Sequence, residues 1–303
     1  MRSILLILLS TTLIAQERPL ASLPYTPSLE PAFMDRTVNP CVDFFKYSCG
    51  NWIRTNPIPP DQSYWTVYAK MTDENQRFLW GILEQLAKPS PRRSANEQKI
   101  GDYFGACMDE SAVEKLGAAP LRPVLDQIQG MRTLDDLPPL LARLHLGPGD
   151  AAPLFGFGSN QDFADSERVI AFASAGGLGL PDRDYYVKTD PKSQEIRARY
   201  LEHVAAILQL AGETPAAAKD GAATVMAIET ALAKASLTRV ELRDPHKMFH
   251  KVDRAQFLAM TPSFHWAAYW KALGVAAPPV VNVTEPAFFA EVETELKARS
   301  LAE

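Results

Sequence analysis

Apolar residues recur every three or four positions along most of this chain, and this spacing places them on one face of an α-helix. The clearest run covers residues 61–86 and stops before Pro89, which cannot continue a helix. The pattern predicts helices over residues 61–86, 96–116, 120–128, 133–144, 193–211, 215–237, 254–260, 266–273 and 286–302. The last helix has no capping glycine or loop after it, so the chain is expected to stop inside a helix.

Two short segments break the helical pattern. Residues 154–158 and 168–173 are small or apolar runs bounded by glycine and polar positions, and they predict the strands of a β-hairpin. Residues 159–167 are then the polar loop of the hairpin, and the glycines of 176–179 predict a turn after it. The predicted fold class is mainly α, a multi-helix domain with a small β-hairpin.

Residues 39–65 are the most unusual stretch, because they gather two cysteines, six aromatic residues and four prolines. Apolar groups at helical spacing predict a short helix within 41–52, and Gly50 is a natural place for that helix to end. The prolines that follow prevent the helix from continuing. The rest of the chain is organised around this stretch.

The N-terminus has the pattern of a secretory signal peptide. Met1 and Arg2 supply a positive charge, and residues 4–15 form a mostly apolar run without charges. A bilayer span needs roughly 20 apolar residues, so no stable membrane anchor is expected. We therefore predict a signal peptide over about residues 1–21, a flexible N-terminus over 22–38, and export to the periplasm or the outside of the cell.

Composition places the chain among folded globular proteins. It has 303 residues, of which 47% are hydrophobic and 22% charged. The formal net charge is −5, and the basic residues are dispersed rather than gathered into a run. This charge pattern excludes nucleic acid as an expected partner.

Three cysteines, Cys41, Cys49 and Cys107, are candidates for disulfide bonds in an exported protein. An odd number leaves one thiol without a partner in the chain. Cys107 shares the apolar face of the helix predicted over 96–116 and is expected to point inward. The alternative is that no bridge forms, because buried cysteine also packs as a small hydrophobic residue.

The histidines provide one pair with metal-ligand spacing, His246 and His250, which are four residues apart. On a helix, this spacing would place both imidazoles on one face, as in zinc proteases. However, Lys247 stands where an H-E-x-x-H helix has its glutamate, and Pro245 leaves room for barely one turn. A surface loop is the favoured interpretation, and no metal ligand is assigned.

Other motifs do not indicate catalysis. The glycines of 176–179 lack the lysine and serine of a phosphate-binding loop, and no G-x-S-x-G elbow is present. Asp182, Arg183 and Asp184 predict a local ion-pair cluster with Tyr185 and Tyr186 packed beneath it. No catalytic residue is predicted in this chain.

Several blocks together resemble the N-terminal portion of the neprilysin and endothelin-converting-enzyme family of zinc metalloendopeptidases. The first block is P-C-x-D-F-F-x-Y-x-C-G-x-W at residues 40–52, followed by the Pro57-Ile58-Pro59 segment. Further blocks are Y-F-x-x-C-M-D at 103–109, G-L-P-D-R-D-Y-Y at 179–186, R-D-P at 243–245, W-x-x-Y at 266–269 and V-N-V at 281–283. The resemblance spans about residues 35–300.

This resemblance implies a fold and a chemistry. Family members hydrolyse oligopeptides with one zinc ion, held by an H-E-x-x-H helix and a later glutamate in a thermolysin-like catalytic domain. Neither segment is matched here, so no zinc and no other cofactor is expected in this chain. Residues 39–303 are then an N-terminal peptidase-family region, mostly a helical cap domain, truncated at its C-terminal end and without the catalytic half.

The resemblance also implies roles for four residues. The counterparts of Cys41, Cys49 and Cys107 form disulfide bonds with cysteines that this chain does not contain, so the three are expected to be disulfide half-sites. Many relatives carry arginine at the position of Tyr64 and use it near the C-terminal side of the substrate. Tyr64 is therefore a candidate substrate-cavity position that lacks the guanidinium.

Two functions from different classes follow. In the first, the chain is the N-terminal part of an exported zinc metalloendopeptidase that acts on oligopeptides, and it is inactive alone. In the second, it is a non-catalytic secreted helical domain that binds peptides or another partner.

Overall fold

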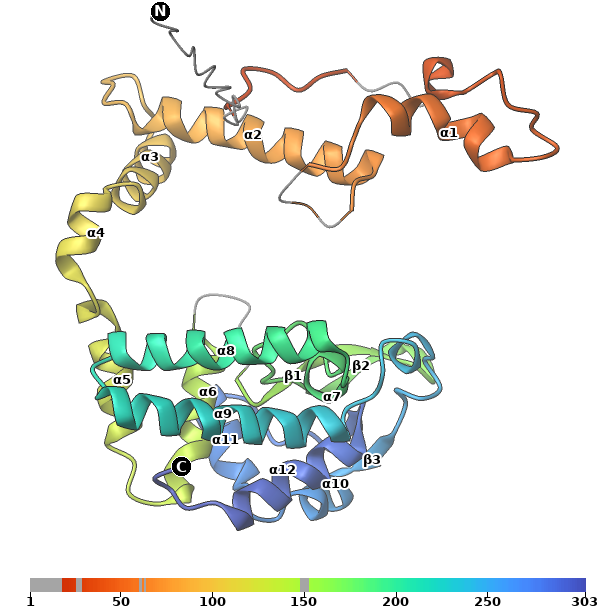
Figure 1. Ribbon diagram of the computed structural model, residues 1–303. Coiled ribbons are helices and arrows are strands. Elements are labelled where there is room, and N and C mark those ends of the chain that lie inside the picture. Colours follow the sequence, from red (N-terminus) through yellow and green to blue (C-terminus); the bar gives the residue numbers. More distant parts are fainter. Residues whose placement is uncertain (1–17, 26–28, 60–61, 63, 148–152) are drawn as a thin grey trace, which may run out of the picture. The chain divides into compact units, whose positions relative to one another are not determined.

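The computed structural model confirms a mainly α fold with a small β-sheet (Figure 1). It describes residues 18–25, 29–59, 62, 64–147 and 153–303. Most of the predicted signal peptide lies outside the described residues. The chain divides into two compact units, Met1–Gly117 and Ala118–Glu303. No helix in the described ranges is long and apolar enough to cross a membrane.

The first unit is built from helices. They are η1 (Pro31–Phe33), α1 (Phe44–Thr55), α2 (Val67–Ala87), α3 (Ala95–Cys107) and α4 (Glu110–Leu116). The Asp43 side chain caps α1 by accepting a hydrogen bond from the backbone N–H of Lys46. The prediction that this helix ends at Gly50 is wrong, since α1 continues to Thr55. Gly50 instead lies where α1 comes close to Asp35, because a Cβ at this position would lie 2.9 Å from the Cβ of Asp35.

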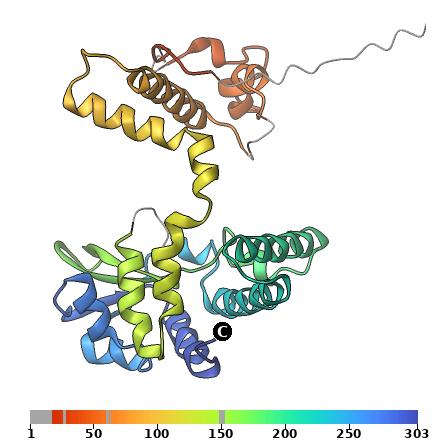
Figure 2. The same cartoon turned by 90° about the vertical axis from the view of Figure 1, so that its left-hand side faces the viewer.

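Helices α2 and α3 pack side by side (Figures 1 and 2). α2 begins at Val67 rather than at residue 61, because Thr66 is extended and its hydroxyl caps the helix. At the start of α3, Ser94 and Glu97 form a capping box. At Gly101 the two helices approach closely, because a Cβ there would overlap with the carbonyl oxygen of Leu86.

The prediction of a single helix over residues 96–116 is wrong, because the helix is interrupted between α3 and α4. Asp109 takes a non-helical conformation and its side chain accepts a hydrogen bond from the backbone N–H of Ala112, which starts α4. Cys107 therefore sits at the last position of α3. It is exposed, so the prediction that it points inward is also wrong.

The second unit combines helices with a sheet (Figure 2). Its helices are η2 (Ala119–Leu121), α5 (Arg122–Gln129), η3 (Leu134–Asp136), α6 (Leu137–His145), α7 (Asp184–Val187), α8 (Pro191–Leu210), α9 (Pro215–Ala235), η4 (Glu241–Arg243), α10 (Arg254–Met260), α11 (Trp266–Leu273) and α12 (Pro286–Ala298). α8 and α9 pack against each other as a long pair. α12 ends at Ala298, so the expectation of a chain end inside a helix is wrong.

In the described part of the chain, four strands form one sheet in the order β1-β2-β4-β3. The strands are β1 (Phe155–Asp162), β2 (Asp165–Ala175), β3 (Lys251–Asp253) and β4 (Val280–Val283). β1 and β2 are antiparallel, which confirms the hairpin, while β2 pairs parallel with β4. The predicted loop 159–167 is wrong, because both strands run through it to a tight turn. Ser159, Asn160 and Gln161 face solvent on this edge strand, although Asp162 is buried, so the pattern does not resemble a buried strand.

The core of the second unit is an aromatic cluster that joins β1 to α10, α11 and α12. Phe155 is fully buried, with Trp266 at a ring-centroid distance of 5.1 Å and Tyr269 at 5.5 Å. His145 holds α6 onto this cluster through Nδ1, 2.7 Å from the Tyr269 hydroxyl, and Nε2, 2.9 Å from the carbonyl of Pro153.

Candidate functional site

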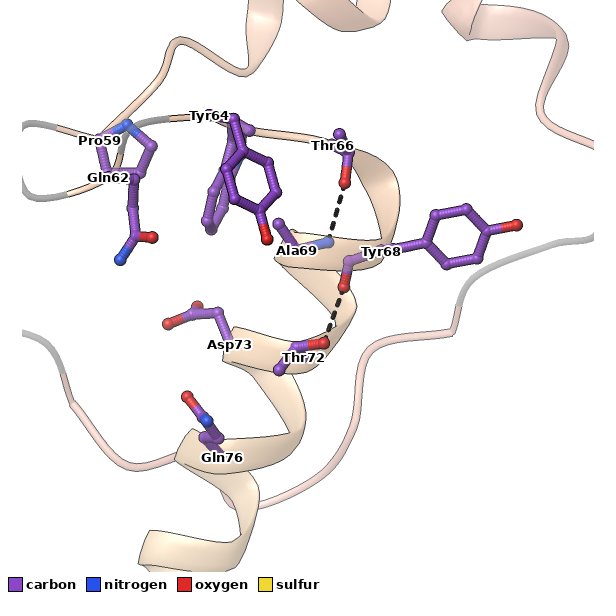
Figure 3. Close-up of a pocket in the computed structure, with 10 residues that line it drawn as sticks. Pro59, Gln62, Tyr64, Thr66, Tyr68, Ala69, Thr72, Asp73 and Gln76 are labelled. Atoms are coloured by element: carbon purple, nitrogen blue, oxygen red, sulfur yellow. Dashed lines mark hydrogen bonds between the residues drawn. The ribbon is translucent and has the colours of Figure 1, made fainter. Parts of the chain in front are cut away.

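A pocket in the first unit contains Tyr64, the candidate cavity position identified from the sequence (Figure 3). Its volume is about 540 Å³. The lining residues come from the segment before α2 and from the first turns of α2: Pro59, Gln62, Tyr64, Trp65, Thr66, Tyr68, Ala69, Thr72, Asp73 and Gln76. Tyr64 is 63% exposed, so its ring is available to a ligand.

Helix periodicity explains one wall of the pocket. Ala69, Thr72, Asp73 and Gln76 are spaced at three and four residues, which places them on one face of α2. Figure 3 shows these side chains along the helix, with the hydroxyl end of Tyr64 pointing toward that face. The opposite wall comes from the extended segment that leads into the helix.

Hydrogen bonds at the start of α2 keep this wall in place. The Thr66 hydroxyl accepts from the backbone N–H of Ala69 at 3.1 Å, and the Thr72 hydroxyl donates to the carbonyl of Tyr68 at 3.0 Å (Figure 3). The Thr66 contact satisfies one of the backbone donors that the first turn of an α-helix leaves unpaired.

Asp73 is the one charged residue among the described residues that line the pocket. Its carboxylate lies 3.7 Å from the guanidinium of Arg77, and both side chains are 29% exposed. The described lining holds no histidine, cysteine or lysine, and Asp73 is its one carboxylate, so the described lining residues do not supply a set of metal ligands.

The three cysteines of the expected half-sites are all unpaired. Cys41 and Cys107 are exposed, and Cys49 is half-buried. Their accessibility is what a bond to another segment requires, but it does not test that pairing. Their role as half-sites stays a prediction.

The histidine pair does not form the helical face that its spacing would allow. Residues 245–248 are a turn, in which the backbone N–H of His246 donates to the Asp244 carboxylate at 3.0 Å. Nδ1 of His250 lies 3.0 Å from the carbonyl of Val283. Within the described ranges, no group of three or more His, Cys, Asp or Glu side chains could hold a metal ion.

The 179–186 block has a structural role that depends on a residue the sequence did not single out, Glu229 in α9. The Tyr186 hydroxyl donates to Oε2 of Glu229 at 2.7 Å, and the Tyr200 hydroxyl donates to Oε1 at 2.9 Å. Burial and the nearby carboxylate raise the pKa of Tyr200 to about 12, and they raise the pKa of Tyr186 further. The network joins this block to α8 and α9.

The ion-pair prediction for the same block is only partly right. Asp182 pairs with Arg239 at 2.9 Å, and Asp184 pairs with Lys188 at 2.9 Å, so the two carboxylates do form ion pairs. Arg183 is not their partner, because its Nε donates to the carbonyl of Ala233 at 3.1 Å. The charged residues of this block therefore contact Lys188, Arg239 and the backbone of α9, rather than pairing with one another.

Comparisons with known proteins all point to the same peptidase family. The family model of the peptidase family M13 N-terminal region matches residues 40–303. Human endothelin-converting enzyme 1 is 29% identical over 264 residues, which cover 84% of this chain and 33% of that protein. Neprilysin-3 of Drosophila melanogaster is 30% identical over 246 residues, covering 78% of this chain and 31% of that protein. The chain therefore spans about a third of the length of the curated relatives it matches.

Solved structures show the same fold. The Mycobacterium tuberculosis zinc metalloprotease Zmp1, in complex with an inhibitor, superposes with a TM-score of 0.76 at 24% identity, covering 93% of this chain and 42% of that chain. PepO of Lactobacillus rhamnosis gives a TM-score of 0.61 at 20% identity, covering 81% of this chain and 38% of that one.

Fold and relatives together define the class of protein as the N-terminal region of a metallopeptidase. The chain belongs to peptidase family M13, the neprilysin and endothelin-converting-enzyme family.

Proposed function

We propose that this chain is the N-terminal region of an exported zinc metalloendopeptidase that hydrolyses oligopeptides, and that its part is to supply a wall of the substrate cavity. The observation that carries the proposal is the family match over residues 40–303. The pocket around Tyr64 supports it, since its described lining presents aromatic and amide groups that can contact a peptide. The chain alone is expected to be inactive.

The described residues do not fit a zinc site. They contain no suitable cluster of ligands, and the Nδ1 atom of His250 contacts a backbone carbonyl. Tetrahedral zinc needs three protein ligands in a catalytic site and four in a structural one. We therefore assign the metal to the part of such proteins that this chain does not span.

Export and disulfide bonding belong to the same proposal. The charged start and apolar run of residues 1–15 support export, and an oxidising compartment would allow Cys41, Cys49 and Cys107 to form bonds with cysteines of a catalytic half. N-terminal sequencing of the mature protein checks the leader, since a start near residue 16 or 22 is expected. A mature protein that still begins at Met1 and stays in the cytoplasm would contradict export.

The activity proposal is tested on the purified 303-residue chain. Metal analysis and a quenched-fluorescence peptide assay are expected to show no stoichiometric zinc and no hydrolysis. Stoichiometric zinc with cleavage that a chelator abolishes would overturn the claim that the chain is inactive alone.

The second candidate is a non-catalytic secreted domain that binds peptides or another partner. Exposed aromatic residues in the first unit favour it, among them Tyr68 at 82% and Tyr103 at 76% exposure. This role predicts a monodisperse protein that binds peptides without turnover. Aggregation at micromolar concentration would argue against it, because large exposed apolar patches normally need a cover.

A further inference from the structure

We propose that the Tyr64 pocket selects a basic side chain, lysine or arginine, of a bound peptide. The inference rests on the proposed peptide-binding role of this pocket. Asp73 is the one charged lining residue in the described part of the chain, and the rings of Tyr64 and Trp65 line the same cavity. A carboxylate beside aromatic faces is the chemistry that recognises an ammonium or guanidinium group.

The Asp73 carboxylate is available to a ligand. Its contact with Arg77 is 3.7 Å, which is longer than a hydrogen bond, and Nε of Arg77 donates to the carbonyl of Arg18 at 2.8 Å. A ligand cation could therefore take the hydrogen-bonding positions on the carboxylate that Arg77 leaves open.

The start of α2 works in the opposite direction, because a helix N-terminus favours anions. Its effect corresponds to about half a positive charge and is confined to the first turn. The Thr66 hydroxyl already accepts from the Ala69 N–H there. Arg77 lies 3.7 Å from the Asp73 carboxylate and offsets part of its charge, but this carboxylate is the one charged group on the described lining, so the pocket is expected to attract a cation more than a carboxylate.

The other nearby charges do not change this balance. Lys70 is not a lining residue, and its ammonium lies 3.3 Å from the Glu74 carboxylate. Tyr64 itself is neutral and brings an aromatic face in place of the arginine that many relatives carry. A peptide that ends in a free carboxylate therefore finds no cation among the described residues that line this pocket.

The test measures binding of three amidated, N-acetylated pentapeptides to the purified 303-residue chain by fluorescence anisotropy. They differ only at the central residue, which is lysine, norleucine or glutamate. The lysine peptide is expected to bind about 3–10-fold more tightly than the norleucine peptide at low salt, and glutamate more weakly than norleucine. Salt should reduce the preference, because an accessible ion pair is screened.

Matched variants assign the effect to the pocket. Asp73→Asn keeps the shape and removes the charge, so it should abolish the preference for lysine, while Glu74→Gln removes a neighbouring charge outside the pocket and should preserve it. Tyr64→Arg should also abolish the preference. Equal binding of the lysine and norleucine peptides, or a preference that survives Asp73→Asn, would overturn this inference alone. Binding of none of the three peptides would instead overturn the proposed peptide-binding role.

Discussion

The hydroxyl group of Tyr186 lies 2.7 Å from Oε2 of Glu229, and this buried hydrogen bond joins the 179–186 block to helix α9. The same hydroxyl accepts from the backbone N–H of Leu180 at 2.7 Å, so it also closes its own loop. Tyr200 donates to the second oxygen of Glu229. The glutamate is 9% exposed, and the two phenols supply the partners that a buried charge needs.

Removing the Tyr186 hydroxyl should destabilise the second unit. Tyr186→Phe removes one of the two hydroxyl groups that donate to Glu229, and it also removes the hydroxyl that accepts from the Leu180 N–H. Loss of a hydrogen-bond partner of a buried polar group costs about 1–3 kcal/mol of folding free energy. Urea unfolding followed by circular dichroism measures the loss. Tyr185→Phe is the matched control, because the Tyr185 hydroxyl is not part of the network around Glu229, and it should change stability little. Equal effects of the two variants would contradict the network.

The same tyrosines predict a loss of stability at alkaline pH. Their pKa values are raised in the folded protein, that of Tyr200 from 10.0 to about 12, mainly by burial and then by the Glu229 carboxylate. The unfolded chain releases these protons first, so the stabilisation is complete below about pH 10 and is lost as the pH rises through the folded pKa. Chemical unfolding at several pH values should show this decrease, and Tyr200→Phe should make it shallower. A stability that is constant from about pH 9 to 12 would exclude this coupling.

Exposure of the thiols predicts their reactivity. In the reduced chain, Cys41 and Cys107 are exposed and should react rapidly with iodoacetamide, while the half-buried Cys49 should react more slowly. Intact-mass spectrometry over time, with peptide mapping, follows each site. In a longer protein that carries the partner cysteines, all three sites should be protected until a reductant is added. Protection of all three in the 303-residue chain would indicate a bond to another chain or a different fold.

Local signals explain which parts of the fold can be predicted. Apolar spacing places helix α10 at its observed bounds, and Asp253 and Gln256 form a capping box at its start. Gly274 likewise ends α11 in a left-handed conformation. Strands β3 and β4 escape prediction, because runs of three and four residues become strands only through pairing with distant segments.

The candidate site is predictable only in part, for the same reason. Family resemblance suggests Tyr64 as a substrate-cavity position; Tyr64 lines a pocket of the first unit, and its role in a substrate cavity stays a prediction. Asp73 gives no such signal, because a carboxylate on the polar face of an amphipathic helix is normally a solvated residue. Its position in the pocket appears only in the structure, where Asp73 lines the same pocket as Tyr64 and Trp65. Glu229 is missed in a similar way, since its tyrosine partners lie 29 and 43 residues away in the sequence.

Two glycines of α3 provide a direct test of the packing in the first unit. Gly101 is buried against the carbonyl of Leu86, so Gly101→Ala forces α2 and α3 apart and should cost about 1–3 kcal/mol. A Cβ at Gly105 would meet no neighbouring part of the described chain within 4 Å, and Gly105→Ala should stabilise the helix by up to about 1 kcal/mol. Thermal unfolding of both variants should therefore shift the midpoint in opposite directions. A midpoint that rises for Gly101→Ala would mean that the two helices do not approach as closely as described.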